Sequence, residues 1–97
     1  MKKYEVLIEG RNFVIEIDGK EQRAGFYTTR WVEAKDPKEA ELKAVAIIKR
    51  DPKLKGMAKN SLKNPPMLYL DEIHEVKTFK GIKLPGAGYT FYCKKLK

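Results

Sequence analysis

The chain has 97 residues, of which 42% are hydrophobic, 10% aromatic and 35% charged, and it carries a formal net charge of +8 and one cysteine. This length supports one hydrophobic core but not two, and the hydrophobic content excludes a disordered chain, so we expect a single domain over residues 1–97 with a frayed end at 95–97. No apolar run approaches the roughly 20 residues needed to cross a bilayer, and one cysteine cannot form an internal disulfide, so we expect a cytoplasmic protein without a membrane partner.

Two strands, each with one apolar face, are predicted in the first twenty residues. Apolar and polar residues alternate over Tyr4–Glu9 and again over Phe13–Asp18, with the period of two that a half-buried strand shows. The Gly10-Arg11-Asn12 sequence predicts a break between them. Asp18-Gly19 predicts a two-residue hairpin turn, because aspartate and glycine tolerate the positive φ that a type I′ turn requires.

A third strand is expected over Gln22–Ala34, with a bulge at Ala24-Gly25. Tyr27 and Trp31 fall on one face of this strand and Phe26 falls on the other. Both faces carry aromatic side chains, so both are expected to be partly covered.

A helix is predicted to begin at Pro37. Asp36 is a favourable N-cap, proline suits the first helical position, and Glu39 completes a capping-box pattern. Glu39 and Lys43 are spaced to form an exposed ion pair across one helical turn. The apolar stripe expected to face the core comprises Ala40, Ala44, Ile47 and Ile48.

Four further segments are predicted after this helix. A second Asp-Pro pair repeats the cap-and-proline pattern and predicts a short helix or turn over Pro52–Ala58. Apolar residues recur every three positions from Met67 to Phe79, a spacing that fits a strand carrying a bulge. Gly81–Gly88 is interpreted as a loop because it is rich in glycine and proline, and no phosphate site is expected there because the residue order of a phosphate-binding loop is missing. A last strand is expected over Tyr89–Lys94.

The resulting order of elements is β-β-β-α-β-β. We expect an α+β fold in which one main helix packs on one face of a mostly antiparallel sheet. This arrangement resembles the two-layer sandwiches of ferredoxin-like type. Over Tyr4–Arg50, the strand order and the Asp36-Pro37-Lys38-Glu39-Ala40 helix start also resemble the HicB-type antitoxin domains. That second resemblance implies a toxin-binding role, although the glycine-containing loop usual before the helix in those domains is missing here.

Neither metal binding nor catalysis is predicted. Asp71, Glu72, His74 and Glu75 lie within five residues, but on a strand they divide between two faces, so no more than two can easily converge on one ion. Cys93 and His74 lack an activating context such as a helix N-terminus. We therefore expect no metal, no cofactor and no catalytic residue, and we do not expect an enzyme.

All the surplus positive charge lies in the second half of the chain. Residues 1–48 carry nine Lys or Arg against nine Asp or Glu, whereas residues 49–97 carry twelve against four. A one-sided electrostatic field attracts polyanions, and aromatic rings among cations form a surface on which bases can stack. We therefore predict an acidic partner, either nucleic acid or an acidic protein. The residues expected to contact it are Lys49, Arg50, Lys53, Lys55, Lys59, Lys63, Lys80, Lys83, Tyr92 and Lys94.

The aromatic residues support an alternative hypothesis. If Tyr27, Trp31 and Tyr69 lie on the sheet face opposite the helix, together with Tyr92, they form more aromatic surface than one helix can cover. Such a surface favours a homodimer or another protein partner. Under this hypothesis the chain is an interaction module, antitoxin-like or structural, with no role in nucleic-acid binding.

Overall fold

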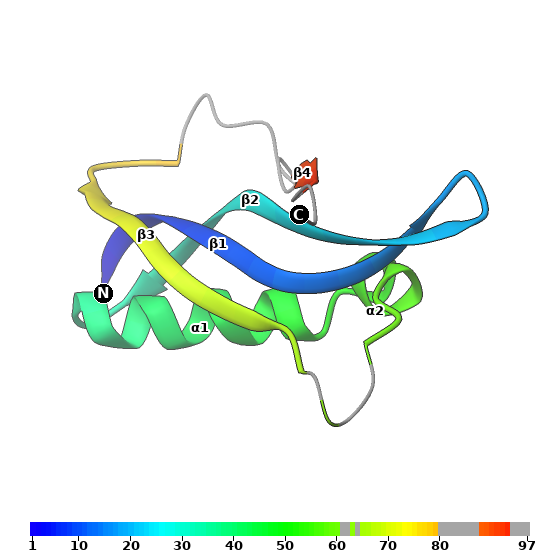
Figure 1. The fold of residues 1–97 in the computed structure, drawn as a ribbon. Coiled ribbons are helices and arrows are strands. Elements are labelled where there is room, and N and C mark those ends of the chain that lie inside the picture. Colours follow the sequence, from blue (N-terminus) through cyan, green and yellow to red (C-terminus); the bar gives the residue numbers. More distant parts are fainter. Residues whose placement is uncertain (61–62, 64, 80–87, 94–97) are drawn as a thin grey trace.

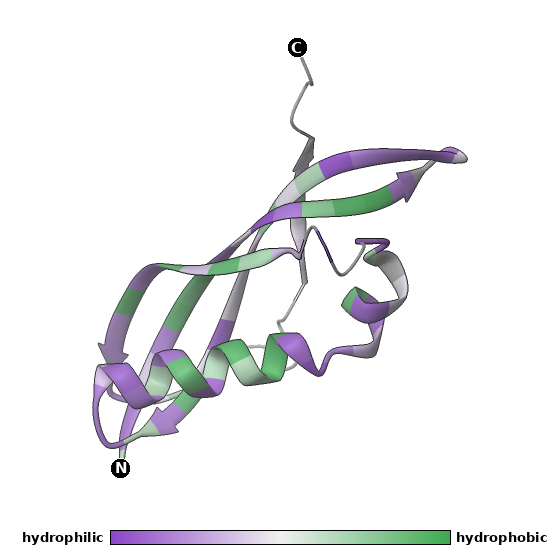
Figure 2. Cartoon of the chain, turned by 60° about the horizontal axis from the view of Figure 1, so that its bottom comes forward, coloured by the Kyte–Doolittle hydropathy of each residue, from purple (hydrophilic) through white to green (hydrophobic). Residues whose placement is uncertain are grey.

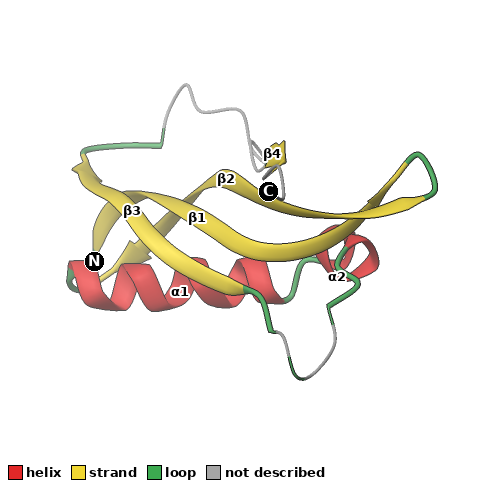
Figure 3. Ribbon diagram, viewed as in Figure 1, coloured by secondary structure: helices red, strands yellow, loops and turns green. Residues whose placement is uncertain are grey.

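The computed structural model describes residues 1–60, 63, 65–79 and 88–93, and it contains one four-stranded antiparallel sheet with one main helix packed on it (Figure 1). The sheet order is β3-β1-β2-β4, so the two longest strands lie at its centre. The elements are β1 (Lys2–Ile17), β2 (Lys20–Ala34), α1 (Pro37–Lys49), α2 (Pro52–Met57), β3 (Met67–Val76) and β4 (Thr90–Cys93). The helices lie on the same side of the sheet, with α2 near the end of the β1–β2 hairpin (Figure 3).

The first third of the chain forms two strands and not three. β1 runs unbroken through the Gly10-Arg11-Asn12 sequence, where the pairing with β2 shifts by one residue: Gly10 pairs with Phe26, and Phe13 with Ala24. Asn12 takes a positive φ of 62° there, so the signal interpreted as a break is a bulge within one strand. The order is therefore β-β-α-α-β-β, and the predicted ferredoxin-like arrangement is wrong.

The hairpin turn is confirmed, but the bulge predicted in β2 is wrong. Asp18 and Gly19 have φ angles of 53° and 79° and connect the paired residues Ile17 and Lys20, as a two-residue turn of positive φ requires. Ala24-Gly25 is paired with β4 without a shift. The extra residue belongs to β1, opposite Gly25.

Helix α1 begins as predicted. The Asp36 side chain accepts a hydrogen bond from the backbone N–H of Glu39 at 2.8 Å, which satisfies one of the unpaired donors of the first turn. The Glu39 carboxylate accepts from the backbone N–H of Lys35 at 3.2 Å. It also lies 3.4 Å from Lys43 Nζ, the predicted ion pair.

The core lies between α1 and the sheet. Ala40, Ala44 and Ile48 are fully buried, whereas Ile47 is 44% exposed, so its predicted burial is wrong. The small alanines spaced four residues apart bring α1 close to the strands, and Ile47 lies about 100° around the helix from Ile48. Hydrophobic and hydrophilic residues alternate along the strands above α1 (Figure 2). The sheet contributes to this core Tyr4, Val6, Ile8, Phe13, Ile15, Ala24, Phe26, Val32 and Ala34.

The later elements agree with expectation where the structure describes them. The predicted short helix forms as α2, with Asp51 as its N-cap. β3 carries the predicted bulge, because Leu7 pairs with Glu72 and Ile8 with Leu70, which leaves Asp71 as the extra residue. β4 forms the predicted last strand. The end at 95–97 and nearly all of the loop predicted at 81–88 lie outside the described residues.

The helices of the described chain are 13 and 6 residues long, and neither combines the length and hydropathy needed to cross a membrane.

Candidate functional site

Six cations predicted from the sequence lie on one continuous segment, residues 49–63, called here the basic segment. Lys49, Arg50, Lys53, Lys55, Lys59 and Lys63 are all exposed, and among the described residues none of them forms an ion pair. The segment is fixed against β1, because Lys59 donates from its backbone N–H to the Val14 carbonyl at 2.7 Å. Asn60 accepts from the Val14 N–H at 2.9 Å. These two contacts hold Lys59 and Asn60 beside the hairpin.

The only carboxylate of the basic segment is directed into the protein. Asp51 Oδ2 accepts a hydrogen bond from the Tyr89 hydroxyl at 2.6 Å and lies 3.6 Å from Nη2 of Arg30, which is 5% exposed. The hydrogen bond from Tyr89 lowers the pKa of Asp51. Burial, with the bond to Asp51, raises the pKa of Tyr89 to about 12. Asp51 therefore compensates the buried guanidinium of Arg30, and it forms no ion pair with the described lysines.

A small apolar hollow opens within the basic segment. Its volume is about 180 Å³, enough for one apolar side chain. Lys49 and Lys55 border it, and the remaining lining residues are Phe13, Leu54, Ala58, Pro66 and Leu68. Cations around an apolar depression suit a partner that offers an apolar side chain flanked by acidic ones.

The aromatic residues predicted as an interface share the sheet face that α1 does not cover, called here the open face. Tyr27 is 39% and Tyr69 is 41% exposed. Trp31 is partly buried and donates from Nε1 to Glu5 at 3.2 Å. The Tyr27 and Tyr92 rings lie 5.6 Å apart. Carboxylates are interspersed with these rings, so the open face is mixed in character.

The predicted contact residues of the second half do not all meet. Tyr92 belongs to the open face, whereas Phe91 and Tyr89 pack against the core next to Phe26, at ring distances of 5.6 and 4.9 Å. Tyr92 is therefore separated from the apolar hollow of the basic segment by the sheet. The remaining predicted contacts, Lys80, Lys83 and Lys94, lie outside the described residues.

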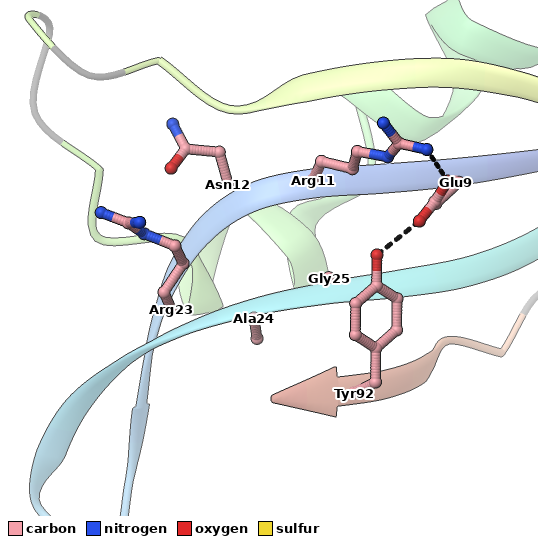
Figure 4. Close-up of a pocket in the computed structure, with 7 residues that line it drawn as sticks. All are labelled: Glu9, Arg11, Asn12, Arg23, Ala24, Gly25 and Tyr92. Atoms are coloured by element: carbon pink, nitrogen blue, oxygen red, sulfur yellow. Dashed lines mark hydrogen bonds and ion pairs between the residues drawn. The ribbon is translucent and has the colours of Figure 1, made fainter. Parts of the chain in front are cut away.

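A second hollow, of about 340 Å³, lies on the open face beside the bulge of β1 (Figure 4). It is called here the arginine hollow and is lined by Glu9, Arg11, Asn12, Arg23, Ala24, Gly25 and Tyr92. Arg11 Nη2 lies 2.9 Å from Glu9 Oε1, and the guanidinium carbon lies 4.8 Å from the centre of the Tyr69 ring. Tyr92 donates from its hydroxyl to the other oxygen of Glu9.

These contacts fix the charge state of the hollow. Glu9 is 8% exposed, and hydrogen bonds from Arg11 and then Tyr92 lower its pKa. The bond to Glu9, with burial, raises the pKa of Tyr92 to about 12. Near neutral pH the carboxylate is therefore ionised and the phenol protonated.

The acidic cluster of β3 is divided by the strand, as predicted. His74 Nε2 and Glu72 Oε2 lie 3.3 Å apart, and Asp71 is the bulge residue between differently paired neighbours. Within the described residues, no group of three potential metal ligands comes together. The Cys93 side chain lies outside the description.

Three arginines of the first half were not predicted as site residues, because that half is electrically neutral. Alternation with Thr28 and Val32 places Arg30 on the buried face, a signal that was present in the sequence. Arg11 lies in the Gly10-Arg11-Asn12 sequence, where glycine and asparagine indicate an irregular backbone. Nothing in the sequence brings Arg23 to Arg11, because their proximity depends on the register of β1 and β2.

No protein-family model, curated protein or solved structure matches the chain.

Proposed function

We propose that the chain is a binding domain without enzymatic activity, and that its basic segment docks onto an acidic segment of another protein. One observation carries the proposal: within the described chain, two exposed lysines without ion pairs, Lys49 and Lys55, border an apolar hollow, while the only carboxylate of the basic segment is bound to Arg30 and Tyr89. The cations attract an acidic chain, and the hollow provides a place for one apolar side chain.

The apolar hollow favours an acidic protein over nucleic acid. A phosphate backbone gains nothing from a depression lined by Leu54, Phe13 and Leu68, whereas a leucine or phenylalanine side chain loses its contact with water there. Five of the six cations are lysines, which lack the bidentate geometry with which arginine recognises phosphate. The ring of Tyr92, on which a base could stack, lies on the open face.

The proposal can be tested with peptides and an oligonucleotide of equal net charge. We expect a glutamate-rich peptide with one central leucine to bind about tenfold more tightly than the same peptide with serine at that position, because burying leucine contributes about 1.5–3 kcal/mol. Replacing both Lys49 and Lys55 by glutamine should weaken binding about tenfold. Fluorescence anisotropy at two salt concentrations measures both effects.

The matched control removes the same charge elsewhere. Lys35→Gln with Lys38→Gln, just before and within the first turn of α1, should change affinity by less than about twofold. If a single-stranded oligonucleotide binds more tightly than both peptides and leucine brings no gain, the partner is nucleic acid and the acidic-protein proposal fails. Affinity that does not change with salt contradicts any polyanion partner.

A second candidate function is self-association through the open face. The specific observation in its favour is that Tyr27, Trp31 and Tyr69 share the sheet face that neither helix of the described chain covers, and that two of these rings are about two-fifths exposed. Exposed aromatic residues are enriched at protein interfaces. A twofold arrangement would cover the rings in both copies.

Sedimentation equilibrium tests this candidate. Self-association predicts a mass that rises toward twice that of the chain with concentration, and Trp31→Gln and Tyr69→Gln should each return it to the monomer value while the helical circular dichroism stays unchanged. Leu42→Gln is a suitable control, because Leu42 is 62% exposed on α1 and away from the open face. A monomer mass at all concentrations contradicts the candidate.

A further inference from the structure

We infer that the arginine hollow on the open face binds a small organic anion, whose phosphate or carboxylate group is held by Arg23 and Arg11. None of the six cations of the basic segment lines this hollow. It is therefore a different site from the one proposed above, and it would take a different class of ligand.

The charges that line the hollow favour an anion. Arg11, Arg23 and Glu9 are the charged residues that line it, so the lining has a net positive charge. Arg23 is exposed and has no ion pair among the described residues. Arg11 directs one nitrogen to Glu9, and a guanidinium has five N–H donors, so donors are left for a ligand. Asn12 lies between the two arginines in Figure 4.

The lining around Arg11 is held in place before any ligand arrives, whereas the Arg23 guanidinium points away from Arg11 and has to turn toward it to share a ligand (Figure 4). Arg11 is fixed on one side by Glu9 and on the other by the Tyr69 ring. Glu9 is held in turn by the Tyr92 hydroxyl, which reaches it from β4 (Figure 4). A Cβ atom at Gly25 would lie 2.3 Å from the Tyr92 ring, so only glycine allows this ring to cross the strand. Because Arg11, Glu9 and Tyr92 are already oriented, Arg23 is the arginine that has to be ordered when a ligand binds.

The size of the hollow sets the class of ligand. A volume of about 340 Å³ lies at the lower end of the range for small-molecule sites, about 300–1,000 Å³. A bare phosphate ion would leave most of it filled with water. Tyr92 also lines the hollow, and an aromatic side chain there suits a ring or a short carbon chain attached to the anionic group.

The site can be tested by NMR titration of the full chain with phenyl phosphate, benzoate and inorganic phosphate, at constant ionic strength set with sodium chloride. We expect saturable shifts of the Arg23 side-chain Nε–H and Gly25 N–H signals. Phenyl phosphate should bind several times more tightly than inorganic phosphate. If benzoate saturates the site and phenyl phosphate does not, the natural head group is a carboxylate, and the reverse result indicates a phosphate.

Two variants separate this site from general attraction to a basic protein. Arg23→Gln should weaken binding at least tenfold, whereas Arg50→Gln, which removes one guanidinium from the basic segment, should change it by less than twofold. Well-dispersed spectra show that both variants are folded. Shifts that do not saturate with either aromatic anion, or equal weakening by the two variants, overturn the proposal.

The same variants keep this inference distinct from the proposed function. Arg23→Gln should leave binding of the leucine-containing acidic peptide unchanged within twofold. Replacing Lys49 and Lys55 by glutamine should leave phenyl phosphate binding unchanged. If Arg23→Gln weakens both ligands equally, a single diffuse field binds them and the separate site does not exist.

Discussion

Two glycines allow aromatic rings to cross the sheet at the bulge of β1. A Cβ atom at Gly10 would lie 2.4 Å from the Phe26 ring on the core side, and one at Gly25 would lie 2.3 Å from the Tyr92 ring on the open face. Real Cβ atoms do not approach other atoms so closely. The two glycines therefore permit one ring on each side of the sheet, and the arginine hollow forms beside one of them.

We predict that Gly25→Ala destabilises the protein by about 1–3 kcal/mol, the usual cost of overpacking. The added methyl group displaces Tyr92, which breaks its hydrogen bond to Glu9. Gly56→Ala is the control: no atom lies within 4 Å of its Cβ position, and alanine in a helix should stabilise by about 0.5–1 kcal/mol. Urea unfolding measures both changes, and equal effects of the two substitutions would contradict this role of Gly25.

The candidate site was only partly predictable at the residue level. The six cations of the basic segment lie close together in the sequence, so they could be predicted to share one region of the fold. The arginine hollow joins Arg11 with Arg23 and Tyr92, residues whose proximity requires both the register of the hairpin and the pairing of β4. Alternation places each residue on a face, but it does not show which residues lie opposite one another.

At the level of elements, the features predicted correctly are those that can be recognised from neighbouring residues. The cap at Asp36, the Asp18-Gly19 turn and the bulged β3 each rest on neighbouring residues, and all three are confirmed. The bulge of β1 was interpreted as the end of a strand because glycine and asparagine favour positive φ in turns and in bulges alike. Only the pairing with β2 distinguishes the two.

The short strand β4 is attached to the helical layer by a polar contact at its start. Tyr89 precedes β4 and donates to Asp51 at the N-terminus of α2, while Arg30 of β2 lies beside both. Thr28 also donates to the Gly88 carbonyl at 2.9 Å. Four residues of pairing hold a strand weakly, so we expect these bonds to set the stability of β4.

This contact predicts a defined pH dependence. Folding raises the pKa of Tyr89 from 10.0 to about 12. The contribution of its protonated hydroxyl to the stability of the fold is therefore fully present below pH 10 and is lost as the pH rises toward 12. Folding lowers the pKa of Asp51. The stabilisation by its ionised carboxylate is therefore present above pH 3.8, the ordinary pKa of the group, and it is lost as the pH falls below that value.

The difference in free energy of unfolding between the parent and Tyr89→Phe should therefore shrink between pH 10 and pH 12. Tyr69→Phe on the open face serves as the control, since Tyr69 lies outside this contact. Denaturant unfolding across this pH range measures the difference. A difference that stays constant from pH 7 to pH 12 would contradict the role given to the Tyr89 hydroxyl.

For the whole molecule, the fold separates the charges from the aromatic rings. The basic segment begins at the end of α1 and continues through α2 to its contact with the hairpin, while Tyr27, Trp31 and Tyr69 lie on the open face among carboxylates. The expectation that rings and cations form one platform depended on their nearness in sequence. β4 places Phe91 toward the core and Tyr92 on the open face, so neither ring lies beside the cations of the basic segment.

The binding of an acidic peptide to the basic segment is the central claim, and NMR mapping of the leucine-containing glutamate peptide tests it most directly. We predict that the largest backbone shifts fall on Lys49, Leu54, Lys55 and Leu68, around the apolar hollow, and that they saturate with one affinity. Shifts that concentrate on the open face, or that spread evenly over all exposed lysines without saturating, would contradict the claim.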